Sequence, residues 1–292
     1  MVIDKHFSNT LSRDINDYPE GIVVIIDKPY RWTSADVVRK LKFAAIRHFQ
    51  KKNLKVGHAG TLDPLATGVL VLCIGNACKQ AQALQDTDKE YIADVCFGAT
   101  TPSYDLEKDV DRFYPFDTVT RESVLSMLPG FIGEQEQIAP LFSAKQVDGV
   151  RAYDLARKMH NRGEVLDDAA KELLHLGHIK INDIQLLKFS VTDSEYCKSK
   201  EEGSSCEKGA SGRINVADIP QGLPVATLRI SCSKGTYIRA LARDLGERAS
   251  SGAFLTDLRR TASGGHAVSD ASDLESVLSI FKIQCQPSSD CQ

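Results

Sequence analysis

The stretch GHAGTLDPLATGVL, residues 57–70, holds the strongest chemical signal in the chain. Its Gly residues permit backbone angles and close approaches that larger residues resist. Pro64 keeps the preceding Asp63 out of the helical region, so the backbone is extended there. The stretch therefore predicts a carboxylate presented from a constrained loop. An Asp-Pro pair in a Gly-rich segment is usually just a turn, so this stretch alone favours a turn over a catalytic site.

Apolar and β-branched runs on both sides of this loop predict strands. Gly21–Asp27 (GIVVIID) is one such run and ends at Lys28-Pro29, and residues 69–75 (VLVLCIG) are the other. Between the two strands, Thr33 or Ser34 is suited to cap a helix that continues to about Gln50.

The rest of the chain also mixes strands with helices. Tyr91–Gly98 alternates between apolar and other positions, which predicts a half-buried strand. Further strands are expected at 178–189 and 225–232, and helices at 120–128, 152–161 and 236–249. Because these elements show no regular strand–helix–strand rhythm, we predict an α+β fold.

The chain divides by composition into three consecutive parts, and the second part contains an insertion. Residues 1–20 form a polar leader, and residues 21–266 form the folded domain. Within it, residues 193–213 are rich in Ser, Gly and Glu, which is typical of a flexible surface insertion. Residues 267–292 form a short tail, too short for a complete additional domain.

Composition places the chain among ordinary globular proteins. Of its 292 residues, 42% are hydrophobic and 26% are charged, and the net charge is −3. The longest apolar runs are too short to span a bilayer, and the N-terminus has no signal-peptide pattern. We therefore expect a cytoplasmic protein that does not bind a membrane. The eight Cys are scattered without a C-x-x-C pair, which favours reduced thiols over disulfides or a zinc site.

Positive charge is concentrated before the Gly-rich loop. From Lys28 to Lys55 the chain has nine Lys and Arg residues and one acidic residue, Asp36. Such a cluster can bind the phosphates of an anionic polymer. It can equally be the solvated face of a helix, and charge alone leaves both interpretations open.

Five segments, taken in order, resemble the motifs of the TruB family of bacterial tRNA pseudouridine synthases. Residues 57–70 resemble the catalytic motif of that family. The other segments are IIDKPYRWTS at 25–34, DKEYIADVCFG at 88–98, PLFSAKQVDGVRAYDLAR at 140–157, and SCSKGTYIRALARDLG at 231–246 with LTDLRRTASG at 255–264. The resemblance extends over residues 21–264, and five ordered motifs make it specific.

This resemblance implies a fold, a reaction and a partner. The fold would be that of pseudouridine synthases, a mixed and mostly antiparallel sheet flanked by helices and RNA-binding loops. The reaction would isomerise the T-loop uridine at tRNA position 55 to pseudouridine, without a cofactor or a metal. The partner would be the T stem-loop of tRNA, bound by a monomer without an obligatory protein partner.

The resemblance also implies the catalytic residues. Asp63 stands at the position of the family's catalytic aspartate, which attacks either the ribose C1′ or the base. A carboxylate can act in this way as a nucleophile. Arg239 matches the arginine that pairs with this aspartate and would keep it ionised. Tyr91 matches the tyrosine that stacks on the target base.

Four further residues match substrate-binding positions. His58 would insert into the RNA loop in place of the everted base, whose unstacking has an energetic cost. Leu258 would line an apolar pocket, and Lys28 would hold phosphates together with the helix that follows it. Tyr237 would line the same pocket as Arg239, because residues two apart in an extended segment point to the same side.

Two departures from the family's sequence pattern and one rival function limit how far the family's properties can be assigned to this chain. Arg31 stands where the family usually has Gly, and Gln146 stands where it usually has Lys, so one cation is missing from the segment that grips RNA. The rival is a binding module that folds tRNA without modifying it. Such a chaperone would need Lys28 and His58 but not Asp63, so Asp63, Tyr91 and Arg239 together favour the enzyme.

Overall fold

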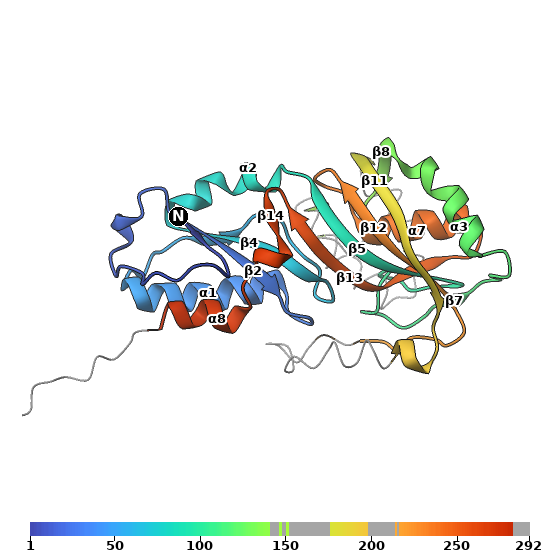
Figure 1. Cartoon of the computed structure of the whole chain (residues 1–292), viewed down its shortest axis with the longest axis horizontal. Coiled ribbons are helices and arrows are strands. Elements are labelled where there is room, and N and C mark those ends of the chain that lie inside the picture. Colours follow the sequence, from blue (N-terminus) through green and yellow to red (C-terminus); the bar gives the residue numbers. More distant parts are fainter. Residues whose placement is uncertain (141–145, 148–149, 152–175, 198–213, 215, 283–292) are drawn as a thin grey trace, which may run out of the picture. The chain divides into compact units, whose positions relative to one another are not determined.

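A computed structural model describes residues 1–140, 146–147, 150–151, 176–197, 214 and 216–282 (Figure 1). The chain has two compact units. Unit 1 comprises Met1–Gln85 and Gly265–Gln292, and unit 2 comprises Asp86–Gly264. In the described part of the chain, no helix has both the length and the apolar character needed to cross a membrane.

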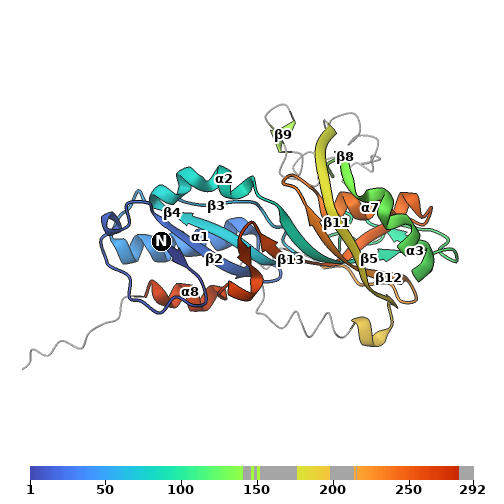
Figure 2. The same cartoon turned by 45° about the horizontal axis from the view of Figure 1, so that its top comes forward.

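Unit 1 is built on a small sheet with helices on both faces (Figures 1 and 2). In this sheet β4 pairs antiparallel with β2 and with β3, and β1 runs parallel to β2. The strands of this sheet are β1 (Val2–Ile3), β2 (Ile22–Lys28), β3 (Val56–His58) and β4 (Thr67–Ile74), and unit 1 also contains the short strand β14 (His266–Ala267). The helices are α1 (Ser34–Phe49), α2 (Ala81–Gln85) and α8 (Leu274–Ile280), with 3-10 turns at Ile15–Asp17, Gly75–Gln80 and Val268–Asp270.

Helix α1 begins and ends where the sequence predicts. Thr33 accepts a hydrogen bond from the Asp36 backbone N at 3.0 Å, and the Asp36 side chain accepts one from the Thr33 N at 3.3 Å. This reciprocal pair is a capping box, which satisfies donors that the first helical turn leaves unpaired. The helix ends at Gln50, whose left-handed φ of 51° stops the helical ladder.

The predicted leader and tail both pack into unit 1. Ile3 of β1 is fully buried, and Val2 pairs with Val23 in the sheet. In the tail, the Ser272 O accepts from the Asp27 N at 2.9 Å, and Phe281 after α8 is buried. The sequence places both segments outside the folded domain, the first because it is polar and the second because it is short. Their buried apolar residues and backbone pairs nevertheless make them part of unit 1.

Unit 2 is an antiparallel sheet in the order β13-β5-β12-β11-β8, and α7 packs against β13 and β5. Its strands are β5 (Lys89–Phe97), β8 (Gly133–Ile138), β11 (Leu176–Val191), β12 (Pro224–Cys232) and β13 (Ala253–Ser263). Two further strand pairs are β6 (Ala99–Thr100) with β7 (Arg112–Phe113), and β9 (Gln146–Val147) with β10 (Val150–Arg151). The helices are α3 (Arg121–Met127) and α7 (Ile238–Arg248), with a 3-10 turn at Leu128–Phe131.

These elements confirm the α+β class and most of the predicted segments. Thr120 caps α3 as expected, and each predicted strand is present. The helix expected at 152–161 and residues 198–213 of the expected insertion lie outside the described residues.

The half-buried character predicted for β5 is wrong, because both of its faces are covered. Tyr91 and Val95 are buried on one face, and Asp94 is buried on the other. The Tyr196 hydroxyl donates to Asp94 Oδ2 at 3.0 Å, and the Thr227 hydroxyl donates to Asp94 Oδ1 at 2.7 Å. Burial, reinforced by the Asp94 charge, raises the pKa of Tyr196, so its hydroxyl stays protonated as a donor. Two neutral donors thus make a buried carboxylate tolerable on β5, an interior strand of the sheet.

Candidate active site

In unit 1, Asp63 lies on a loop whose residues on either side are fixed. The loop joins β3 to β4, and Asp63 itself is half-buried. Before it, the Leu62 N donates to Ser34 Oγ at 2.9 Å, and the Ser34 hydroxyl donates back to the Leu62 O at 3.0 Å. After it, the Pro64 O accepts from Lys28 Nζ at 3.2 Å. The start of α1 and the end of β2 therefore hold the backbone around Asp63, as a positioned catalytic group requires.

Lys28 holds this loop from inside unit 1. Its side chain is fully buried, and Nζ also donates to the Pro29 O at 2.9 Å and the Trp32 O at 2.6 Å. The predicted phosphate contact of Lys28 is wrong, because an ammonium group with no exposed surface cannot reach a polymer in solvent. Lys28 instead ties the turn after β2 to the residue that follows Asp63.

We expect Lys28→Met to lower turnover about tenfold to a hundredfold, because Met has similar length but no donors for the three carbonyls. The free energy of unfolding should fall by about 2 kcal/mol, since buried acceptors lose their partner. Turnover of the RNA substrate that the resemblance implies and urea unfolding measure the two effects. Lys79→Met, at an exposed position of unit 1, is the control. Normal turnover in the Lys28 variant would show that the loop holds its shape without this cation.

Arg31, one of the two departures, has a backbone conformation that favours Gly. Its φ is +62°, in the left-handed region that is costly for residues with a Cβ. This position between β2 and α1 is therefore one that Gly would occupy at lower cost, which agrees with the family's usual residue there. Gln146, the other departure, lies in β9, and nothing in the structure explains the substitution there.

His58, the last residue of β3, lies in the same unit as Asp63. Its backbone pairs with Leu72 of β4, and its side chain is half-buried. Unit 1 thus brings His58, Lys28 and Asp63 together around one loop, and His58 and Asp63 lie in residues 57–70, the segment where the sequence predicts the site.

Unit 2 holds the other predicted residues on β5, β13 and the start of α7. Tyr91 lies opposite Arg260, and Leu258 lies opposite Ala93. Tyr91 and Leu258 are therefore diagonal neighbours on one face of the sheet, where long side chains can meet. Both are buried, with 8% exposure each.

The geometry predicted for Tyr237 and Arg239 is wrong. Tyr237 has extended backbone angles, but Arg239 is already in the first turn of α7, so the two do not alternate as in a strand. Gln137 of β8 holds Tyr237 instead: the Tyr237 N donates to Gln137 Oε1 at 2.9 Å, and Gln137 Nε2 donates to the Tyr237 O at 3.2 Å. The start of α7 is thereby fixed to β8.

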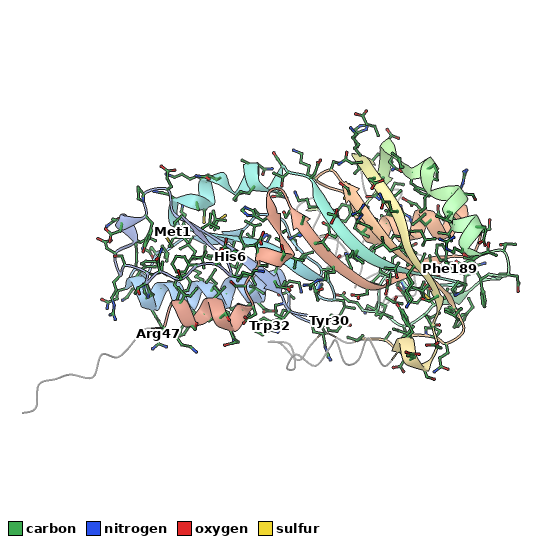
Figure 3. All side chains as sticks on the ribbon, in the orientation of Figure 1. Met1, His6, Tyr30, Trp32, Arg47 and Phe189 are labelled. Atoms are coloured by element: carbon green, nitrogen blue, oxygen red, sulfur yellow. The ribbon has the colours of Figure 1, made fainter. Side chains whose placement is uncertain are left out.

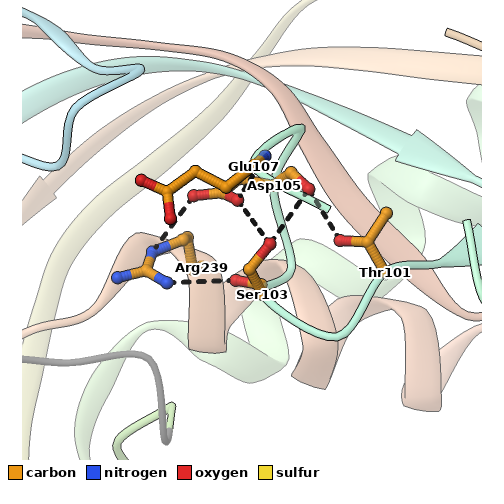
Figure 4. Close-up of polar contacts among 5 residues, drawn as sticks. All are labelled: Thr101, Ser103, Asp105, Glu107 and Arg239. Atoms are coloured by element: carbon orange, nitrogen blue, oxygen red, sulfur yellow. Dashed lines mark hydrogen bonds and ion pairs between the residues drawn. The ribbon is translucent and has the colours of Figure 1, made fainter. Parts of the chain in front are cut away.

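Arg239 contacts a carboxylate that the sequence analysis did not identify (Figure 4). Its Nε lies 3.7 Å from Asp105 Oδ2, and its Nη1 donates to the Ser103 O at 3.1 Å. Both Arg239 and Asp105 are 5% exposed. The guanidinium is thus held in a fixed orientation by an ion pair and a carbonyl.

Asp105 is itself held by its own loop. Its Oδ1 accepts from the Ser103 hydroxyl at 2.6 Å and the Glu107 N at 3.0 Å, and its carbonyl accepts from the Thr101 hydroxyl at 2.7 Å (Figure 4). Asp63 and Arg239 belong to different units, so their pairing stays a prediction.

The described residues provide neither of two other kinds of catalytic group, a metal centre and a cysteine nucleophile. No group of three or more His, Cys, Asp or Glu side chains there is arranged to hold a metal ion. Burial raises the pKa of the Cys73 thiol and that of the Cys232 thiol, each to about 11, so neither is a thiolate nucleophile at neutral pH.

Residues 47–209 match the family model described as TruB family pseudouridylate synthase (N terminal domain). A protein of Phocaeicola vulgatus called tRNA pseudouridine synthase B is 45% identical over 260 residues, which are 89% of this chain and 93% of that protein. A protein of the same name from Bacteroides thetaiotaomicron is 44% identical over 259 residues, 89% of this chain and 92% of that protein.

Two solved structures share the fold. One is an H/ACA RNP bound to a substrate RNA containing 2′-deoxyuridine, with a TM-score of 0.54 and 20% identity over 96% of this chain and 61% of that chain. The other is a Cbf5-Nop10-Gar1 complex, with a TM-score of 0.52 and 23% identity over 90% of this chain and 57% of that chain. This chain therefore spans less than two thirds of either solved chain, and the likeness concerns the fold alone.

Proposed function

The chain belongs to the TruB family of pseudouridylate synthases, and on that premise we propose that it isomerises the uridine at position 55 of the tRNA T loop to pseudouridine. The observation that carries this proposal is 45% identity to a protein called tRNA pseudouridine synthase B over 93% of its length. The fixed backbone on both sides of Asp63 supports it from the structure.

The reaction needs one nucleophile and no net exchange of atoms. We infer that the Asp63 carboxylate attacks the ribose C1′ or the base, so that the bond between N1 and C1′ breaks. The freed uracil then turns, and its C5 forms a new bond to C1′. The proton that leaves C5 is balanced by one gained at N1, so the product is an isomer of the substrate. A carboxylate held by its backbone suits this role, because position is a large part of a nucleophile's advantage.

Unit 2 supplies the groups that would face the base and the carboxylate. Tyr91 and Leu258 share one face of the sheet, and we assign them to an apolar pocket in which Tyr91 stacks on the uracil. Arg239 would pair with Asp63. A guanidinium has five donors, so it can contact more than one carboxylate at once, and Asp105 would orient it for that purpose.

RNA binding must also evert the target uridine. Unstacking a nucleotide costs a few kcal/mol, and we assign His58 to the vacated position in the loop, where an imidazole can stack on the neighbouring bases. Tyr237 would line the pocket from the start of α7. We expect a single chain to do this in the cytoplasm, with tRNA as its partner.

Purified protein should convert one T-loop uridine in unmodified tRNA to pseudouridine when a metal chelator is present. Chemical mapping of pseudouridine after incubation reads out both the site and the extent of conversion. Tight binding of tRNA without any conversion would contradict the proposal and support the chaperone. Conversion that stops when the chelator is added would contradict the mechanism without metal.

A further inference from the structure

The exposed face of α1 carries concentrated positive charge. Between Asp36 and Asp63 the sequence has seven Lys and Arg residues and no Asp or Glu, although the whole chain has a net charge of −3. All seven are exposed in the structure. We call Arg39, Lys42, Phe43 and Arg47 the outer face of α1.

An aromatic ring lies in the middle of this charge. Phe43 is 64% exposed, and the Arg47 guanidinium lies 5.6 Å from the centre of its ring. Arg39, Phe43 and Arg47 are spaced by four residues, so they lie on one side of the helix. The core contacts of α1 come from its other side, through buried residues such as Leu41 and Ala45. Phe43 is therefore a large apolar side chain that core packing does not explain.

The charges on the outer face are only partly compensated. Arg39 Nη1 lies 2.8 Å from Asp36 Oδ1, and Lys40 Nζ lies 3.8 Å from Glu275 Oε1 of α8. Lys42 and Arg47 form no ion pair with a carboxylate among the described residues. Two exposed cations on either side of an exposed ring make a surface that suits an anionic partner with flat apolar groups.

The outer face extends well away from the candidate active site. Ser34, at the start of α1, is hydrogen-bonded to Leu62 next to Asp63. A helix rises 1.5 Å per residue, so Arg47 lies roughly 20 Å along the axis from Ser34. Figure 3 shows the side chains of Trp32 and Arg47 near the two ends of α1. If the target uridine of an RNA reaches Asp63, the nucleotides that contact Arg47 must therefore lie some distance from that uridine.

We propose that the outer face of α1 binds tRNA phosphates outside the T stem-loop, with Lys42 and Arg47 as the phosphate contacts and Phe43 packed against a ribose or a base. This inference rests on the proposed function, because it takes tRNA as the substrate. It adds a second contact surface, by which the enzyme distinguishes an intact tRNA from an isolated stem-loop.

The test compares intact tRNA with the isolated T stem-loop in binding titrations at several salt concentrations. For intact tRNA, the double variant Lys42→Gln/Arg47→Gln should bind about tenfold more weakly, since each exposed ion contact contributes only modestly to affinity. The slope of log K against log salt should become shallower by about 1.5, because each lost phosphate contact contributes roughly 0.7 to 0.9. The affinity for the stem-loop should fall much less.

Two further variants separate charge from stacking. Phe43→Ala should weaken the binding of intact tRNA while leaving the salt slope at its original value. Lys5→Gln/Lys79→Gln removes the same charge from exposed positions of unit 1 outside the outer face, and it should leave both affinity and slope unchanged. Thermal unfolding of each variant shows whether the fold is retained.

Equal loss for intact tRNA and for the stem-loop would overturn the proposal, as would no loss for either. In the second case the outer face would be a solvated surface or the binding site of an acidic protein. These outcomes are distinguishable from a failure of the proposed function. If unaltered protein converts no uridine in either RNA, the enzyme assignment itself is wrong.

Discussion

Asp63→Asn is expected to abolish conversion of the T-loop uridine, with a fall in kcat of at least about 10⁴-fold. The amide has the same size as the carboxylate but is a poor nucleophile, so the step that breaks the N1–C1′ bond loses its attacking group. The backbone contacts of Leu62 and Pro64 do not involve the side chain of residue 63. The loop should therefore keep its course in the variant.

Single-turnover conversion of unmodified tRNA measures the chemical step directly, and a binding titration measures affinity separately. Affinity should stay within about threefold, because the carboxylate contributes mainly to the transition state. Glu20→Gln, at an exposed position of unit 1, is the control for the loss of one negative charge. An Asp63→Asn variant with more than a small fraction of normal turnover would exclude nucleophilic attack by this residue.

Asp105→Asn is expected to lower kcat about 10²-fold to 10³-fold, which is typical for the loss of a preorganised charged group. The Asn side chain can still accept the hydrogen bonds of Ser103 and Glu107 through its Oδ1. It places an NH₂ group where Oδ2 now faces the guanidinium of Arg239. Breaking this buried ion pair should also lower the free energy of unfolding by about 3 kcal/mol.

A double-mutant cycle distinguishes positioning from plain destabilisation. If Asp105 acts through Arg239, the effect of Asp105→Asn on kcat should nearly disappear in an Arg239→Met background, whereas independent effects would add. KM should change little in the single variant. Asp111→Asn is the matched control, since Asp111 is exposed, lies in the same segment and is hydrogen-bonded to Thr100 at 2.7 Å. Additive losses in the cycle would mean that Asp105 acts independently of Arg239 and has only a structural role.

The sequence predicted the features that depend on neighbouring residues. The cap of α1 at Thr33, one of the two residues suited to it, its end at Gln50 and the strand after Gly68 all follow from patterns within a few positions. The constrained loop at Asp63 followed from Gly spacing and from Pro64. Local patterns carry this information because helix caps, turns and strand runs are decided by short-range sterics and hydrogen bonds.

The contacts that the sequence missed join distant parts of the chain. Ser103 and Arg239 are 136 residues apart, and Gln137 and Tyr237 are 100 apart. No spacing rule links such positions, so Asp105 and Gln137 had no signal in the sequence. Lys28 was misassigned for a related reason: a Lys looks the same in sequence whether it extends into solvent or, as here, donates to three internal carbonyls.

Unit 1 is made from both ends of the chain, and this arrangement bears on how the protein is synthesised. The Phe281 ring lies 6.2 Å from that of Phe49 at the end of α1, and the Asp27 N is bonded to the Ser272 O. In each pair the first partner leaves the ribosome long before the second, because the two are far apart in the sequence. Unit 2 is continuous in sequence and can fold while synthesis proceeds, whereas the unit that bears Asp63 must wait for the last segment. We therefore expect unit 1 of a nascent chain to be incomplete until Ser272 and Phe281 have been synthesised.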